Sequence, residues 1–181
     1  MNLFRSPGRA SRLALGAAIC AIVSLSIGVF AADLSPLSDF GPSEPGFGGT
    51  SNGQTARVSQ AGSANRMTGV QAGQNNLLAN QAGVANAAAM AQAGNNNWMA
   101  LSQSGSGNQF AGYQAGAGNR SVTAQSGGNN AATVTQSGSS MSSQVTQRGT
   151  NNEVSIMQSR NGAALQVMQN GIGARASVFM K

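Results

Sequence analysis

Side chains that could carry out acid–base, nucleophilic or metal chemistry are scarce in this sequence. The 181 residues include no histidine, one cysteine and four acidic residues. Three of the acids, Asp33, Asp39 and Glu44, precede residue 53, and only Glu153 follows it. General acid–base catalysis, an activated nucleophile or a metal centre needs several such groups close together. The composition therefore argues against an enzyme, and we expect no cofactor, no metal and no small-molecule substrate.

The polar group that does recur is the primary amide, which donates and accepts hydrogen bonds at the same time. Glutamine returns every eleven residues, with one step of ten between Gln71 and Gln81. The repeated glutamines are Gln60, Gln71, Gln81, Gln92, Gln103, Gln114, Gln125, Gln136, Gln147, Gln158 and Gln169. Asparagine follows five residues later in eight units, at Asn65, Asn76, Asn86, Asn97, Asn108, Asn119, Asn130 and Asn152. Stacked copies of such side chains can hydrogen-bond to one another, so we expect both sets to form structural ladders.

Glycine is the third recurring residue, and it follows the glutamine by two positions in every unit except the one that has Arg160. These glycines are Gly62, Gly73, Gly83, Gly94, Gly105, Gly116, Gly127, Gly138, Gly149 and Gly171. Glycine tolerates positive φ without steric cost, which suits a tight reversal of the chain. We therefore expect turn glycines between regular elements.

The elements that position these residues are better explained as strands than as helices. An eleven-residue period can indicate a right-handed coiled coil, but a glycine and an asparagine in each unit would interrupt the helix, and no apolar seam accompanies them. Residues between an asparagine and the next glutamine alternate instead. In "NEVSIMQ" (residues 152–158), Val154 and Ile156 share one face with the two amides. Each unit is predicted to be a strand followed by a four-residue arc.

Two strands and two arcs would complete one rung of about 22 residues. Counting "QTARVSQ" (residues 54–60) and "ARASVFM" (residues 174–180) as the first and last strands gives twelve strands. We predict an all-β fold, a two-sheet, cross-β solenoid of about six rungs over residues 54–181. The ten-residue step at "NLLANQ" predicts a shortened strand with a local bulge or register defect.

The residues before the repeats have a different composition. Three arginines precede an apolar run from Leu13 to Phe30, and small residues follow it, which predicts a signal peptide over residues 1–31. A membrane anchor is the alternative. Residues 32–53 are rich in Gly, Pro and Ser and are predicted to be a disordered lead segment, either a passive linker or an address for export. Cys20 lies in the leader, so the repeats have no disulfide.

The pattern Gln-x-Gly-x-x-Asn-x-Ala-x-x-x-Gln occurs as "QAGVANAAAMAQ" at residues 81–92 and as "QSGGNNAATVTQ" at residues 125–136. It resembles the curlin repeat of bacterial curli subunits, over residues 54–181. The resemblance implies a secreted protein that is exported across the outer membrane. It also implies that the protein assembles with further copies and with related curlin subunits into extracellular amyloid fibres. Such fibres serve in surface adhesion and biofilm matrix. Met141, Ala163 and Ala174 replace the asparagine, so the weaker units lie toward the C-terminus.

Two roles remain open within that resemblance. The strand edges of a solenoid carry unpaired backbone groups, and the repeats have no proline and little charge to protect them, which favours templated polymerisation. The regular first nine units favour a major fibre subunit, whereas the irregular, basic residues 159–181 are similar to the end of a minor, nucleating subunit. Six arginines and Lys181 follow residue 53. They either solvate the fibre or attract anionic surfaces, lipid or extracellular DNA.

Overall fold

A computed structural model describes residues 53–181, and the predicted signal peptide and nearly all of the lead segment lie outside them. The described residues form strands without helices, and accordingly none of their elements is a helix able to cross a membrane. The strands are β1 (Thr55–Ser63), β2 (Arg66–Ala72), β3 (Asn75–Val84), β4 (Ala87–Asn95), β5 (Asn97–Ser106), β6 (Gln109–Ala117), β7 (Arg120–Gly128), β8 (Ala131–Ser139), β9 (Ser142–Thr150), β10 (Glu153–Gln158), β11 (Ala164–Ile172) and β12 (Arg175–Met180).

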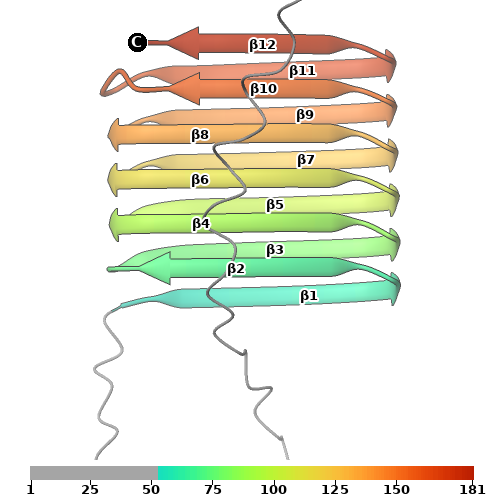
Figure 1. Cartoon of the computed structure of the whole chain (residues 1–181), viewed down its shortest axis with the longest axis horizontal. Helices are drawn as coiled ribbons and strands as arrows, with labels where there is room; N and C mark the ends of the chain where they lie inside the picture. Colours follow the sequence, from blue (N-terminus) through green and yellow to red (C-terminus); the bar gives the residue numbers. More distant parts are fainter. Residues whose placement is uncertain (1–52) are drawn as a thin grey trace, which may run out of the picture. The chain divides into compact units, whose positions relative to one another are not determined.

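Consecutive strands belong to different sheets. The odd-numbered strands form one parallel six-stranded sheet and the even-numbered strands form another, here called the odd sheet and the even sheet. Each odd strand and the even strand after it make one rung, and Figure 1 shows the rungs stacked in chain order from β1 to β12. The predicted two-sheet β-solenoid of six rungs is confirmed.

The register of both sheets follows the sequence period. Gln103 pairs with Gln125, and Gln125 pairs with Gln147, each 22 residues further along the chain. Across the ten-residue step the offset falls to 21, so that Gln60 still pairs with Gln81. Equivalent side chains of successive rungs therefore lie directly above one another.

The predicted bulge at the ten-residue step is wrong. Strand β3 has ten residues and pairs without interruption along β1 and β5. The arc between β2 and β3 is one residue shorter than the others. It has one residue with positive φ, Gly73, whereas the arc between β4 and β5 has two, Gly94 and Asn96. A one-residue slip within a strand would turn its apolar side chains outward, whereas a shorter arc alters only the reversal of the chain.

The core is a thin layer of side chains between the two sheets. Its larger members include Leu77, Met99, Phe110 and Ile156, and all of them are buried. In one column of the even sheet, large and small residues alternate, in the order Met67, Ala88, Phe110, Ala132 and Val154. A Cβ atom added to Gly112 would lie 2.6 Å from the Met99 sulfur and 2.8 Å from the Phe110 ring. The absence of a side chain at Gly112 therefore leaves room for these two large side chains. The first and last rungs have no further rung to cover them, and their inward side chains are less buried.

Candidate functional site: the amide ladders and the two open ends

The glutamine side chains point into the layer between the sheets and form two continuous ladders. Except in Gln158 and Gln169, each Nε2 donates to the Oε1 of the glutamine one rung further along, at 2.5–2.9 Å. The ladder of the odd sheet is Gln60, Gln81, Gln103, Gln125, Gln147 and Gln169. The ladder of the even sheet is Gln71, Gln92, Gln114, Gln136 and Gln158. The structure thus brings all eleven predicted glutamines into two columns.

Most of these amides also tie the two sheets together. The Nε2 of Gln103 on β5 donates to the backbone carbonyl of Ala87 on β4 at 3.2 Å, and Gln147 on β9 donates to Ala131 on β8 at 3.0 Å. Both hydrogens of such an amide are used, and its oxygen accepts the bond from the rung before. Because the groups are buried, each of these bonds satisfies a polar atom that water cannot reach.

The asparagine side chains hold the arcs closed. Asn97 donates from Nδ2 to the carbonyl of Ala93 in its own arc at 3.0 Å and to the carbonyl of Gly116 one rung further along at 2.9 Å. Its Oδ1 accepts the backbone N–H of Asn119 at 3.1 Å. Asparagine therefore satisfies backbone groups in the arcs, where the strand pairing ends.

One predicted ladder residue is wrong. Asn76 is exposed and lies on the outer face of β3, whereas its neighbour Asn75 is fully buried and takes the position in the column. Asn75 Oδ1 accepts from Asn97 Nδ2 at 2.9 Å. Because the arc after Gln71 is one residue shorter, the asparagine of the column lies four residues after this glutamine. The five-residue spacing of the other units therefore selects the wrong asparagine here. The other seven predicted asparagines do lie in the columns, at Asn65, Asn86, Asn97, Asn108, Asn119, Asn130 and Asn152.

The turn glycines are needed for space as well as for conformation. All ten have a φ between 86 and 143°. A Cβ atom added to Gly105 would overlap the carbonyl oxygen of Gly127, and one added to Gly127 would overlap that of Gly149. These inner arcs are stacked so closely that they leave no room for a Cβ, whereas a Cβ added to Gly171 in the last rung would have no atom within 4 Å. Most strands continue through this glycine, so they are longer than the seven residues that the alternation predicts.

A second left-handed residue in most arcs has no consistent sequence signal. It lies two positions after the glycine and is Asn96, Asn129 or Asn151 in three arcs, but alanine, serine or glycine elsewhere. Asparagine tolerates this conformation better than most residues, because its short polar side chain hydrogen-bonds locally. Because several residue types occupy the position, the sequence period does not mark it.

The arc that contains Arg160 is built differently, and Figure 1 shows it projecting between β10 and β11. Strand β10 ends at Gln158, two residues before Arg160. The chain then reverses in a turn in which the N–H of Ala163 donates to the carbonyl of Arg160 at 3.2 Å. Asn161 Oδ1 accepts from the N–H of Ser139 at 2.8 Å and holds the turn to the preceding rung. A different turn, held by the hydrogen bond of Asn161, thus replaces the glycine arc at this position.

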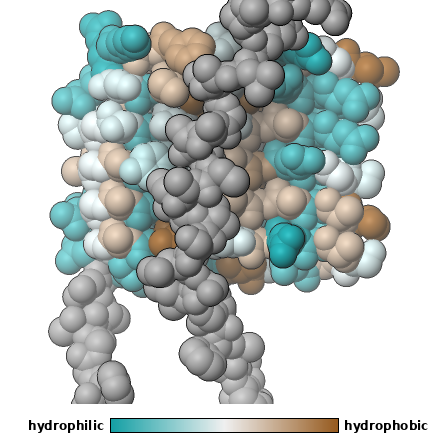
Figure 2. Space-filling view, in the orientation of Figure 1, coloured by the Kyte–Doolittle hydropathy of each residue, from teal (hydrophilic) through white to brown (hydrophobic). Residues whose placement is uncertain are grey.

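The outer faces carry the charges. The arginines of the strands are exposed, as the alternation predicts, and Arg175 pairs with Glu153 at 3.4 Å. The Arg120 guanidinium lies over the Trp98 ring, 4.2 Å from its centroid. In Figure 2, hydrophilic and weakly hydrophobic residues are intermixed on the face that is turned toward the viewer.

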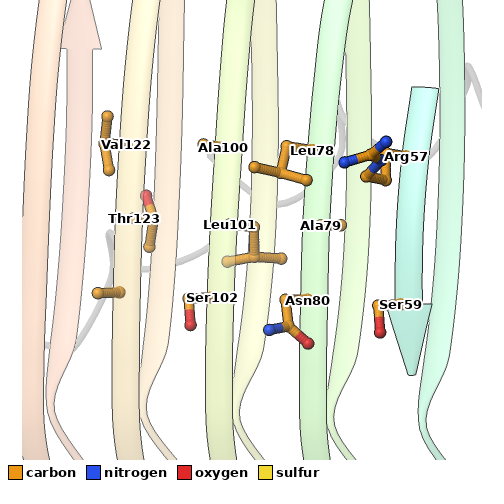
Figure 3. A pocket seen from close by; sticks show the side chains of 11 residues that line it. Arg57, Ser59, Leu78, Ala79, Asn80, Ala100, Leu101, Ser102, Val122 and Thr123 are labelled. Atoms are coloured by element: carbon orange, nitrogen blue, oxygen red, sulfur yellow. The ribbon is translucent and has the colours of Figure 1, made fainter. Parts of the chain in front are cut away.

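A shallow hollow of about 410 Å³ lies on the outer face of the odd sheet. Figure 3 shows its rows of side chains, with Arg57, Leu78, Ala100 and Val122 in one row and Ser59, Asn80 and Ser102 in another. Arg57 is the single ionisable residue in its lining. Within residues 53–181 no three potential metal ligands among His, Cys, Asp and Glu lie together. The hollow offers no acid–base pair.

The two ends of the solenoid differ from its middle. At the first rung, Gln60 and Gln71 donate to the next rung, and among the described residues no donor reaches their Oε1 atoms. At the last rung, Gln169 Nε2 donates to the carbonyl of Glu153 at 3.0 Å, and Gln158 Nε2 faces the Met180 sulfur at 3.7 Å. Both ladders are therefore open at the first rung, whereas at the last rung the odd-sheet ladder is open at Gln169 and the even-sheet ladder ends on Met180.

Comparison with known proteins gives one match. Residues 122–149 match the family model described as "Curlin associated repeat", a stretch that covers most of β7, β8 and most of β9. No curated protein and no solved structure matches the chain. The matched stretch contains the units at Gln125, Gln136 and Gln147, and the same ladders and register continue from it in both directions. The chain thus contains a curlin-associated repeat at residues 122–149, within a solenoid of the same register.

Proposed function

We propose that the protein is a structural subunit of extracellular curli-like amyloid fibres and that it assembles by adding strands to the edges of its first and last rungs. The observation that carries this proposal is the pair of glutamine ladders, which are both open at the first rung, while the ladder of the odd sheet is also open at the last rung. A second molecule that continues the register would extend the backbone pairing and meet a glutamine column.

The edge strands lack the features by which soluble proteins avoid such pairing. Natural sheets protect their edges with proline, charge, bulges or covering elements. No proline lies between Thr55 and Met180. Of the four edge strands, β1, β2 and β12 have one charged residue each, Arg57, Arg66 and Arg175, and β11 has none. Parallel strands stacked in register, with identical amides above one another, are also the arrangement found in cross-β fibres. Both features support self-association over a lasting monomeric state.

The proposed setting of this assembly rests on the resemblance to curlin repeats. A fibre subunit of this kind is secreted through an outer-membrane export machinery and acts outside the bacterial cell, in surface adhesion and biofilm matrix. Its partners are further copies and related curlin subunits. The exposed arginines of the outer faces, Arg57, Arg120 and Arg148 on the odd sheet, support contact with anionic surfaces or extracellular DNA.

Fibre formation is the direct test. Protein isolated from cells that express the full chain, dissolved in denaturant and then diluted, is expected to change from a disordered chain into β-rich fibres that bind thioflavin. Their diffraction should give reflections near about 4.8 Å and 10 Å, the distances between strands and between sheets. A monomer that stays soluble for days at micromolar concentration would contradict the proposal.

A second role, that of a minor nucleating subunit attached to the cell surface, is favoured by the irregular last rung. The Arg160 turn replaces the regular arc, and Met180 stands where the even-sheet ladder would continue. A nucleator needs one end that attaches to other components and another that offers a template for the major subunit.

Deletion of Ser159 to Lys181 separates the two roles. The deletion removes β11 and β12 and leaves β9 and β10 as the new end, with the amides of Gln147 and Gln158. A major subunit should keep both fibre formation and cell retention, because the new edge is as competent as the old one. A nucleator should still form fibres, while cell-bound protein falls and released protein rises. Cell fractionation beside the full chain measures this difference.

A further inference from the structure

The last rung has lost most of the groups that would carry the ladders into another molecule. Four side-chain columns run along the solenoid, two of glutamine and two of asparagine, each with one position per rung. In the last rung these positions are occupied by Gln169, Met180, Ala163 and Ala174. Only Gln169 carries an amide.

Gln169 is placed to extend its column. The side chain is 6% exposed, its Oε1 accepts from Gln147 at 2.9 Å, and its Nε2 uses one hydrogen on Glu153. An amide nitrogen has two hydrogens, and in the inner rungs the second one bonds to the next glutamine. The Met180 side chain has no N–H group that could donate to another molecule. Its sulfur is a weak acceptor for Gln158, and the column ends there.

The direction of the ladders fixes how a second copy would fit. Every glutamine donates toward the C-terminal end of the solenoid, so the first rung presents acceptors and the last rung presents a donor. A donor face matches an acceptor face, whereas two last rungs would place donor against donor. A second copy is therefore expected to stack head to tail, with Gln169 of one molecule below Gln60 of the next.

Side-chain size is also matched across this joint. Continuing the register places Leu165 of one copy against Ala56 of the next, and Val178 against Gly69. The same alternation of large and small residues occurs inside the solenoid, where Gly112 pairs with Val134. The interior positions of the last rung thus fit the first rung of another copy of this chain.

We propose that copies of this chain join head to tail through a joint that a single amide ladder crosses, from Gln169 to Gln60, and that Met180 limits how fast the chain adds to itself. The inference rests on the proposed self-assembly and specifies its partner and polarity. At such a joint the Oε1 of Gln71 in the incoming molecule meets a thioether and loses the amide bond that every inner rung supplies.

The test is Met180→Gln, with Met168→Gln as its matched control. Both substitutions make the same chemical change in the last rung, but Met168 is 62% exposed on the outer face, outside the glutamine columns. Fibres of each variant are sheared and used as seeds for the same variant, expressed as the full chain, and elongation is followed by thioflavin fluorescence. Restoring one ladder bond should raise the rate about five- to tenfold in Met180→Gln and leave Met168→Gln unchanged.

A second variant tests the joint independently. Ala174→Asn would restore the column that ends at Asn152, whose Oδ1 accepts the N–H of Ala174 at 3.0 Å. It should also raise the elongation rate. Wild-type rates in both Met180→Gln and Ala174→Asn, with fibres formed by all proteins, would overturn the inference and leave the proposed function intact. Failure of the wild-type chain to form any fibre would overturn the proposed function, and the inference with it.

Discussion

Alanine in place of Gly127 is expected to prevent fibre growth, whereas alanine in place of its neighbour Gly128 should have little effect. Gly127 has a φ of 107°, and an added Cβ would overlap the carbonyl oxygen of Gly149 in the next rung. Gly128 lies in the same arc, but an added Cβ there would come no closer than 3.6 Å to any atom. The left-handed conformation alone costs roughly 1–2 kcal/mol in a residue with a Cβ, and the overlap adds to this.

The two glycine variants are compared by the same measurements. Gly127→Ala should abolish thioflavin-positive growth on wild-type seeds or delay it at least tenfold, and any fibres should dissolve at lower denaturant concentration. Gly128→Ala should follow the wild-type curve, because its new methyl group makes ordinary van der Waals contacts. Equal growth of the two variants would mean that the arcs are not stacked at the spacing described above.

The sequence predicts the overall fold because stacking makes neighbours of equivalent residues. In a stack, the residues above and below Gln114 are Gln92 and Gln136, so one chemical requirement is repeated in each rung. The requirement appears in the sequence as a period. A globular core, whose positions each have different neighbours, leaves no such record.

Details that belong to a single rung could not be predicted in this way. The repeat pattern places the ten-residue step in a strand, because Asn76 keeps the five-residue spacing from Gln71. The structure shortens the arc and uses Asn75, since burial of Leu77 and Ala79 on one face fixes the register of β3. Counting forward from Gln71 cannot decide between arc and strand, whereas counting back from Gln81 in steps of two places Ala79, Leu77 and Asn75 on its face.

Contacts outside the repeated glutamine, glycine and asparagine positions are also less evident in the sequence. The stacking of Arg120 on Trp98 requires the 22-residue register, and the clamp that Asn161 supplies in the Arg160 arc follows no period. Met180 is different, because it lies eleven residues after Gln169 and so occupies the glutamine position of the last unit. The pairing of β12 with β10 adds that its sulfur faces the Gln158 amide at the end of the even-sheet column.

The ladders and the arcs make different contributions to the rungs. The glycines allow the arcs to approach, and the asparagines satisfy the carbonyls there, as Asn97 does for Ala93. The glutamines act between the sheets, where the core is thin and includes small side chains such as Ala79, Ser121 and Thr123. With so little apolar volume per rung, a satisfied amide network is needed to fix one register among several of similar hydrophobic burial.

Leucine in place of Gln114 should therefore have a large effect, and leucine in place of Gln109 on the same strand should have almost none. Gln114 is fully buried, accepts from Gln92 at 2.8 Å, and donates to Gln136 at 2.7 Å and to the carbonyl of Trp98 at 3.2 Å. Leucine is similar in size but leaves the Gln92 donor and the Gln136 acceptor unpaired inside the protein. Gln109 is exposed on the outer face of β6.

Each buried group left unpaired costs about 1–3 kcal/mol, so Gln114→Leu should destabilise the fibre by several kcal/mol. The denaturant concentration that dissolves half of the fibres should fall clearly, and growth on wild-type seeds should slow at least tenfold, while Gln109→Leu follows the wild type. Replacing Gln92, Gln114 and Gln136 together by leucine removes the partners that a single change would leave unpaired among these three residues. The loss of fibre stability should therefore be less than three times that of Gln114→Leu. If Gln114→Leu fibres were as resistant as those of Gln109→Leu, the backbone and the apolar layer would suffice, and the amide ladders would not set the register.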